Sequence, residues 1–213
     1  MCAGCRKKGT KKITVNSILV MKTDIILAGV GGQGILSIAA VIASAALDNG
    51  LYIKQAEVHG MSQRGGDVQS HLRISDSPVS SDLIPAGQAD VILSVEPMEA
   101  LRYIPFLHNE GWIVTNETPF INIGNYPDID KIISELKARP RVITLNAETL
   151  AKDSCGSERA SNMVMLGAAI PYLKLSEKLL ESAVIRVFGR KGQDVVNSNI
   201  AALRAGLSVS GAK

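Results

Sequence analysis

Residues 24–34 read DIILAGVGGQG, an apolar run that ends in a loop rich in glycine. The run is typical of a buried β-strand, and residues 33–48 continue as a helix whose alanines and serines permit close packing. Asn49 and Gly50 then supply a stop signal for that helix. A second strand is expected over residues 51–58, so this stretch predicts a βαβ unit.

The rest of the chain alternates strands with helices up to residue 145 and predicts only helices after it. Residues 67–75 alternate apolar and polar side chains, and the short loop before them predicts a strand antiparallel to its predecessor. Further strands are expected over 91–95, 112–115 and 142–145. Helices are expected from Glu96-Pro97 to about Leu107, over 129–136, and around 163–170, 179–187 and 196–207. The pattern predicts a three-layer α/β/α Rossmann-like sheet, mostly parallel with an antiparallel strand, and a helical C-terminal part.

Composition predicts one domain and excludes several classes of protein. With 213 residues and 46% hydrophobic residues, the chain can bury one core; residues 21–213 are expected to form it, with residues 1–20 as a flexible extension before the start-like Met21. The net charge of +3 comes from basic residues of that extension, and aromatic residues make up only 4%, which argues against nucleic-acid binding. The longest apolar stretch is too short to cross a bilayer, and no secretory signal precedes it. We expect a cytoplasmic protein.

The glycine loop leaves two interpretations open. Gly29, Gly31 and Gly34 fit the pattern G-x-G-x-x-G between a strand and a helix, where backbone amides and the helix N-terminus can hold a phosphate. Glu57, near the end of the second strand, sits where a dinucleotide fold places a carboxylate for a ribose hydroxyl. The alternative is a tight turn that binds no dinucleotide. The expected antiparallel strand favours this alternative, because a dinucleotide fold would continue with a helix.

A second loop, residues 59–66 with the sequence HGMSQRGG, is a candidate contact site. Arg64 lies beside Gly65 and Gly66, and a planar guanidinium next to glycines suits bidentate recognition of a carboxylate or phosphate. The loop follows the second strand, which is a usual position for a site in α/β folds. A solvated turn that includes a charge is the other interpretation.

The remaining reactive residues predict neither a catalytic group nor a metal site. Cys2 and Cys5 form a lone CxxC that favours an incidental pair over half of a metal site, since Cys155 is the only other thiol. Cys155 has no base partner visible in the sequence, so a structural position is favoured over a nucleophile. His71 and His108 are expected to be surface or satisfied core histidines. Met163 and Met165 are expected in the core or at a subunit contact.

Taken together, the two loops resemble the gamma-type family of the 2-oxoacid:ferredoxin oxidoreductases. The form GMSQRGG over residues 60–66 is most similar to the indolepyruvate branch of that family. The resemblance extends in order and spacing from about Met21 to Gly206. It includes Ile84-Pro85, residues 89–92, Glu96-Pro97 to Leu101, residues 162–168 and residues 199–206.

This resemblance implies a non-autonomous subunit of an enzyme that oxidatively decarboxylates a 2-oxoacid to an acyl-CoA and passes the electrons to ferredoxin. The expected 2-oxoacid is indolepyruvate or another aryl pyruvate. Thiamine diphosphate, magnesium and 4Fe–4S clusters are expected on a larger partner subunit. The sequence has no Gly-Asp-Gly followed by the asparagine-bearing stretch of a thiamine diphosphate–magnesium site, and its three cysteines cannot ligate a four-thiolate cluster. Coenzyme A is expected as cosubstrate, ferredoxin as an indirect partner, and no cofactor as tightly bound by this chain. The alternatives are a stand-alone NAD(P)-dependent oxidoreductase or a non-catalytic nucleotide-binding module.

The resemblance also implies roles for the residues of the two loops. One set would line the coenzyme A side of the site or the subunit interface: Gly29, Gly31, Gly32, Gln33, Gly34 and Arg64. The other set would contact the partner: His59, Gly60, Met61, Ser62, Gln63, Arg64, Gly65 and Gly66.

Overall fold

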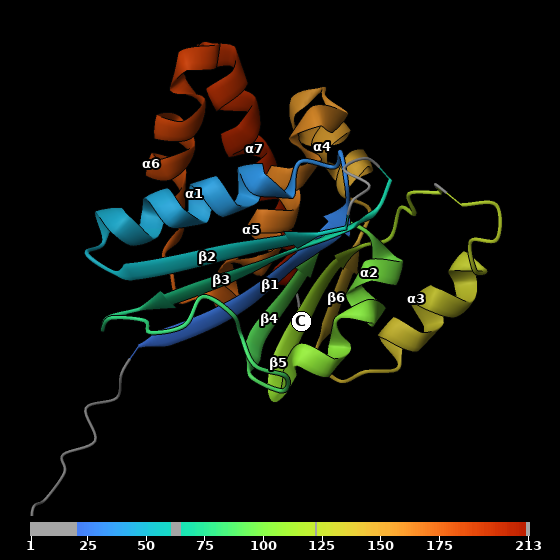
Figure 1. Ribbon diagram of the computed structural model, residues 1–213. Helices are drawn as coiled ribbons and strands as arrows, with labels where there is room; N and C mark the ends of the chain where they lie inside the picture. Colours follow the sequence, from blue (N-terminus) through green and yellow to red (C-terminus); the bar gives the residue numbers. More distant parts are fainter. Residues whose placement is uncertain (1–20, 61–64, 122, 212–213) are drawn as a thin grey trace, which may run out of the picture.

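The computed structural model describes residues 21–60, 65–121 and 123–211 (Figure 1). The strands are β1 (Lys22–Val30), β2 (Tyr52–His59), β3 (Asp67–Ser75), β4 (Ala89–Ser94), β5 (Leu107–Asn116) and β6 (Val142–Leu145). The α-helices are α1 (Ile35–Asp48), α2 (Pro97–Arg102), α3 (Ile129–Lys137), α4 (Ala147–Cys155), α5 (Ser161–Leu173), α6 (Glu177–Phe188) and α7 (Gln193–Ser210). Single 3-10 turns are η1 (Ile104–Phe106), η2 (Glu158–Ala160) and η3 (Gly189–Lys191). The expected extension over residues 1–20 lies outside the described residues.

The strands form one six-stranded sheet in the order β2-β3-β1-β4-β5-β6 (Figure 1). The strands β1, β4, β5 and β6 are mutually parallel, whereas β3 runs antiparallel to both of its neighbours. The prediction of an antiparallel return strand is therefore confirmed. Its position was not predicted: β3 lies between β1 and β2, and it separates the two strands of the βαβ unit.

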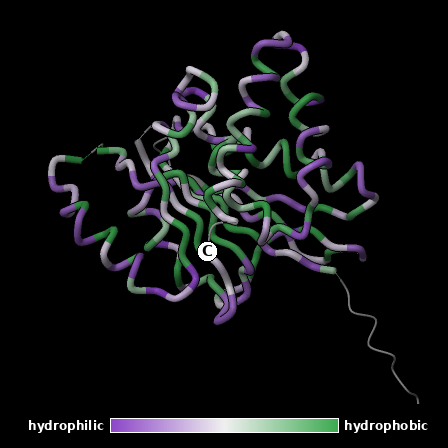
Figure 2. The backbone as a smooth tube through the Cα atoms, turned by 180° about the vertical axis from the view of Figure 1, so that it is seen from behind, coloured by the Kyte–Doolittle hydropathy of each residue, from purple (hydrophilic) through white to green (hydrophobic). Residues whose placement is uncertain are grey.

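Helices cover both faces of the sheet, which confirms the three-layer prediction (Figure 1). Alternate residues of β1 point to opposite faces, as the two-residue period of a strand requires. Ile25 and Leu27 join the core under α1, α4, α5, α6 and α7, while Ile26 and Ala28 join a smaller core under α2 and α3. Figure 2 shows the hydrophobic residues concentrated along the central strands. Because both faces are buried, β1 has a continuous apolar sequence.

One predicted helix needs correction, and one helix was missed. The helix that begins after Glu96 was expected to reach Leu107, but α2 ends at Arg102 and β5 already begins at Leu107. Pro105 explains the early end, because proline lacks the N–H that a helix interior uses and disfavours helical geometry at the residue before it. The helix α4 was not predicted. It buries only two alanines, Ala147 and Ala151, so its apolar pattern is weak.

The helices α5 and α7 cross in direct backbone contact. A Cβ added to Gly167 would lie 1.9 Å from the carbonyl oxygen of Leu203, and a Cβ on Gly206 would lie 1.9 Å from that of Val164. Carbon and oxygen cannot approach so closely, so only glycine fits at either position. Within the described residues, no helix is long and apolar enough to span a bilayer.

Candidate functional site

The glycine loop connects the end of β1 to the start of α1 and needs glycine for two different reasons. Gly32 and Gly34 have φ angles of 105° and 74°, in the left-handed region that favours glycine. Gly29 instead lies in a crowded position, where an added Cβ would come within 2.6 Å of the Val95 side chain. Gly29, Gly32 and Gly34 are therefore required by the local backbone itself, whether or not a ligand binds.

One side chain of the loop and one from α5 hold this loop in place. The Gln33 side chain folds back: its Oε1 accepts from the Val30 N–H at 2.7 Å and its Nε2 donates to the Val95 carbonyl at 3.4 Å. From the start of α5, Asn162 Nδ2 donates to the carbonyl oxygens of Gln33 at 2.9 Å and Gly34 at 3.1 Å. These bonds fix the loop before any ligand arrives, so Gln33 acts here through the shape of the turn.

The structure brings the two loops of the sequence analysis together. The Gly31 N–H donates to the Gly66 carbonyl at 2.8 Å, and the Gly65 N–H donates to the Gly31 carbonyl at 3.3 Å. The pairing of Val30 with Asp67 in the β1–β3 ladder explains this contact, because it continues the ladder by one step. Residues 61–64, which include Arg64, lie outside the described residues. Of His59 only the backbone, at the end of β2, is described, and Gly60 follows it.

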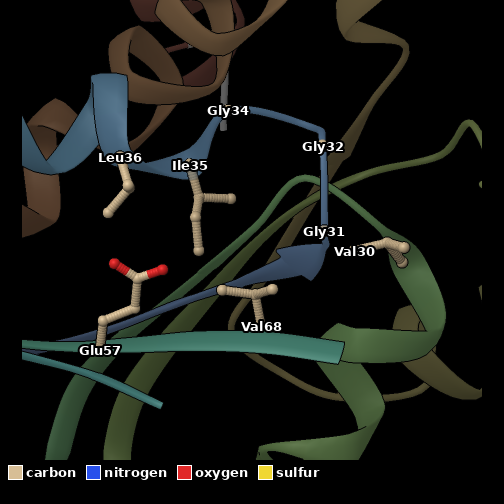
Figure 3. Close-up of a pocket in the computed structure, with 8 residues that line it drawn as sticks. All are labelled: Val30, Gly31, Gly32, Gly34, Ile35, Leu36, Glu57 and Val68. Carbon is tan, nitrogen blue, oxygen red and sulfur yellow. The ribbon is translucent and has the colours of Figure 1, made fainter. Parts of the chain in front are cut away.

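A pocket of about 320 Å³ lies between the glycine loop, the first turn of α1 and the strands β2 and β3 (Figure 3). Within the described residues, the N–H groups of Gly32, Gly34 and Leu36 donate to no protein acceptor. Unpaired amides at a helix N-terminus attract anions. Glu57 projects into the pocket from β2, across from these amides (Figure 3). The lining residues are Val30, Gly31, Gly32, Gly34, Ile35, Leu36, Glu57 and Val68.

The position of Glu57 argues against a dinucleotide site. In a dinucleotide fold the ribose-binding carboxylate follows the strand adjacent to β1. Here β3 lies between β1 and β2, so Glu57 is two strand spacings from β1, about 9.6 Å instead of about 4.8 Å. Val68 of β3 also lines the floor between Glu57 and the loop. The pocket therefore has the unpaired amides of a nucleotide site, but its carboxylate is not in the position that usually binds the ribose.

A second, smaller pocket of about 140 Å³ is lined by the glycine loop, the ends of β4 and β5 and the starts of α4 and α5, and the sequence analysis missed it. It lies at the C-terminal ends of the parallel strands, a usual place for ligands in α/β sheets. Asn116 Nδ2 donates to both carboxylate oxygens of Glu148 at 3.0 Å, and Thr118 Oγ1 donates to Glu148 at 2.8 Å. Asn146, the N-cap of α4, was the sequence signal that could have revealed this cluster.

Two buried carboxylates organise the adjoining edge of the sheet. Glu96 is fully buried and caps α2, accepting from the Glu99 N–H at 2.9 Å, and it also accepts from the Tyr126 hydroxyl. Burial raises the pKa of Glu99, although its bond to Arg102 at 2.8 Å opposes the shift. Burial likewise raises the pKa of the Tyr126 hydroxyl. The Glu96 bonds attach the segment after β5 to the end of β4.

The other residues considered from sequence have structural positions. His71 is buried in β3, where its Nδ1 accepts from the Ile84 N–H at 3.0 Å, and burial lowers its pKa. His108 is exposed and accepts from the Glu110 N–H. Cys155 ends α4, and its thiol contacts the Ala151 carbonyl at 3.1 Å. Met163 and Met165 are buried in the core. Within the described residues, no group of three or more metal-binding side chains is arranged around a common point.

Comparison with known families decides the assignment. Residues 24–209 match the family described as pyruvate ferredoxin/flavodoxin oxidoreductase. The chain belongs to this family. Among curated members, indolepyruvate oxidoreductase subunit IorB of Archaeoglobus fulgidus is 40% identical over 195 residues, which cover 87% of this chain and 94% of the relative. The homologues are thus subunits of 2-oxoacid oxidoreductases, as the resemblance implied.

Solved members of the family share the fold. The gamma subunit of a keto/oxoacid ferredoxin oxidoreductase from Geobacter sulfurreducens superposes with a TM-score of 0.67 at 24% identity, covering 90% of this chain and 99% of that one. A 2-oxoglutarate:ferredoxin oxidoreductase from Magnetococcus marinus, solved with 2-oxoglutarate, coenzyme A and succinyl-CoA bound, gives a TM-score of 0.70 at 24% identity. There the match covers 90% of this chain but only 31% of the longer chain.

Proposed function

We propose that the chain is the small, non-autonomous subunit of a cytoplasmic indolepyruvate or aryl-pyruvate:ferredoxin oxidoreductase. The observation that carries this proposal is the 40% identity to an indolepyruvate oxidoreductase subunit over nearly the full length of both chains. The enzyme would oxidatively decarboxylate a 2-oxoacid to an acyl-CoA and pass electrons to ferredoxin. The experiment that tests it is reconstitution with the larger subunit, described at the end of the Discussion.

The partner subunit would hold thiamine diphosphate, magnesium and the iron–sulfur clusters. Support comes from the cysteine content of this chain, since its three cysteines do not fit a four-thiolate cluster. Further support comes from the Magnetococcus marinus structure, in which the same fold is 31% of a longer chain. In that chain the fold is covalently joined to further sequence, whereas in this protein a subunit interface would hold it against its partner.

One edge of the sheet would face the partner and the coenzyme A side of the active site. It is the edge formed by the C-terminal ends of β1, β2, β4 and β5. The two loops meet at this edge through the Gly31 and Gly66 bonds. Large apolar side chains are also exposed along it, an unusual arrangement for a surface that only meets water. They are Leu36, Val58, Phe120, Ile121 and Ile123. Burial of these side chains would supply affinity, and the loops would supply polar contacts.

Dinucleotide binding is the competing function, because the glycine-loop pocket offers unpaired amides opposite Glu57. We expect no stabilisation by NAD or NADP, since β3 displaces Glu57 from the ribose position. A ligand at a hundredfold excess over its dissociation constant would stabilise the fold by about 2.7 kcal/mol. Melting curves of the full chain with and without each dinucleotide measure this directly. A saturable rise in melting temperature would restore the dinucleotide-dependent oxidoreductase.

The Arg64→Ala variant tests the proposed role of the second loop. We expect its melting temperature to stay near that of the wild type, because the proposed contact of the guanidinium forms only with the partner subunit or coenzyme A. Loss of a desolvated charged contact typically costs about 2–5 kcal/mol, so partner affinity or the KM for coenzyme A should worsen by roughly thirtyfold to several thousandfold. Both quantities can be measured on the reconstituted complex.

Two further variants make the Arg64 experiment specific. Arg64→Lys should recover only part of the loss, because an ammonium group cannot reproduce the planar two-pronged contact. Lys131→Ala removes an exposed cation from α3, away from the loops, and should behave as wild type. Unchanged assembly and kinetics in Arg64→Ala would mean that the loop is only a turn.

A further inference from the structure

A third pocket, of about 500 Å³, shares Asn162 with the pocket of about 140 Å³ described above. Its lining comes from the start of α1, from η2 and the start of α5, and from the junction of α6 with α7. The family motifs at residues 162–168 and 199–206 contribute Asn162, Met163 and Asn199 to its lining, and the roles discussed above do not include this pocket. The lining residues are Ser37, Ser157, Arg159, Ala160, Asn162, Met163, Phe188, Lys191, Asp194, Val195, Ser198 and Asn199.

The pocket is lined by two cations that form no ion pair within the described residues, Arg159 and Lys191. The unpaired state of Arg159 is unusual in this chain, because every other described arginine except Arg190 has a carboxylate partner. Lys191 Nζ lies 5.3 Å from the centre of the Phe188 ring, a contact that leaves its N–H groups free. Asp194 is the one acidic residue of the lining.

A buried amide inside the pocket also lacks half of its partners. Asn199 is only 8% exposed, and its Nδ2 donates to the Val195 carbonyl at 2.7 Å. Its Oδ1 accepts from no donor within the described part of the chain. Because this oxygen is not sealed from solvent, it can accept a hydrogen bond from a molecule in the pocket. Water or a ligand amide or hydroxyl would satisfy it.

The walls divide into a charged part and an apolar part. The cations and the hydroxyls of Ser157 and Ser198 suit the oxygens of a phosphate, which accept charge-assisted hydrogen bonds. Met163 and Phe188 are buried and present apolar surface to the same space. A volume of about 500 Å³ falls within the range of small-molecule sites. The lining therefore fits an anionic group joined to an organic body better than a bare ion.

We propose that this pocket binds a phosphorylated small molecule of nucleotide size. Arg159 and Lys191 hold its phosphate or pyrophosphate, and the Asn199 oxygen accepts from a donor on its organic part. Coenzyme A and a free nucleotide are two sources of this chemistry. The site is separate from the glycine-loop pocket, and its existence does not depend on the function proposed above.

Binding to the purified full chain, measured by titration calorimetry, tests the proposal with pyrophosphate, AMP, coenzyme A and phosphate-free pantetheine as probes. At least one phosphorylated probe should bind saturably and pantetheine should not. Arg159→Ala and Lys191→Ala should each weaken that binding about tenfold, and the double variant about a hundredfold, since each removes a charge-assisted contact. A preference for coenzyme A over AMP identifies the first source, and the reverse identifies the second.

Two controls localise the effect. Lys178→Ala removes an exposed cation of α6 that does not line the pocket and should bind as wild type. Ser198→Phe fills the pocket from α7 without changing its charge and should weaken binding as strongly as the double variant. The proposal is overturned if no phosphorylated probe binds the wild type, or if the double variant binds with wild-type affinity. These outcomes are independent of whether the reconstituted enzyme oxidises a 2-oxoacid.

Discussion

Replacing Gly206 with alanine should lower the melting temperature of the chain by about 6–12 °C, which corresponds to about 3 kcal/mol of unfolding free energy. The added methyl carbon would lie 1.9 Å from the Val164 carbonyl oxygen and 2.8 Å from the carbonyl carbon. Backbone atoms cannot rotate away as a side chain can, so α5 and α7 must separate. That separation disturbs the core these helices share with the sheet.

Related variants separate crowding from a general effect of alanine. Gly167→Ala should cost a similar amount, because its Cβ would lie 1.9 Å from the Leu203 carbonyl oxygen. The double variant should lose less than the sum of the two, since one separation of the helices accommodates both methyl groups. Gly189→Ala is the matched control: it has open space around its Cβ and a φ of −53°. Its unfolding free energy should change by less than about 0.5 kcal/mol.

Thermal or urea unfolding of the wild type and the four variants measures these differences. A melting temperature for Gly206→Ala within 2 °C of the wild type, which corresponds to about 0.5–1 kcal/mol, would contradict the close crossing. The result bears on function as well as stability. Asn162 stands at the start of α5 and bonds the glycine loop, so a shift of α5 against α7 would also displace the support of that loop.

Local sequence patterns were enough to predict most of the fold. The apolar run before Gly29 predicted β1, and the two-residue alternation over residues 67–75 predicted β3. The short loop before β3 predicted its antiparallel direction. These features depend on neighbouring residues, whose hydrophobic period and turn chemistry are visible in the sequence. Pro105 is a local signal as well, and it is sufficient to predict that α2 ends early.

The features that the sequence did not predict depend on contacts between distant segments. The insertion of β3 between β1 and β2 reflects pairing across the sheet, which no local period encodes. Asn162 reaches the Gln33 carbonyl over a separation of 129 residues. The Asn116–Glu148 cluster joins β5 to a helix with a weak apolar pattern. The two loops suggested the family from sequence, but their contact through Gly31 and Gly66 is seen only in the tertiary structure.

The second large effect concerns activity. The purified chain alone should reduce no ferredoxin when supplied with indolepyruvate and coenzyme A, because its three cysteines cannot form a four-thiolate cluster for the electrons. Activity should appear only in the presence of the larger subunit with its thiamine diphosphate and clusters. The expected contrast is between a measurable rate and none, which exceeds the effect of any single substitution considered above.

Ferredoxin reduction is the most direct test of whether the chain acts only together with a larger subunit. It is measured with the chain alone, with the larger subunit from the same host alone, and with the two mixed in increasing ratio. The account predicts no 2-oxoacid-dependent reduction by the chain, and a rate that rises with added chain until the larger subunit is saturated. Arg64→Ala added in place of the wild type should shift that saturation to higher concentration or raise the KM for coenzyme A. Ferredoxin reduction by the chain alone, or a mixture without activity, would contradict the account.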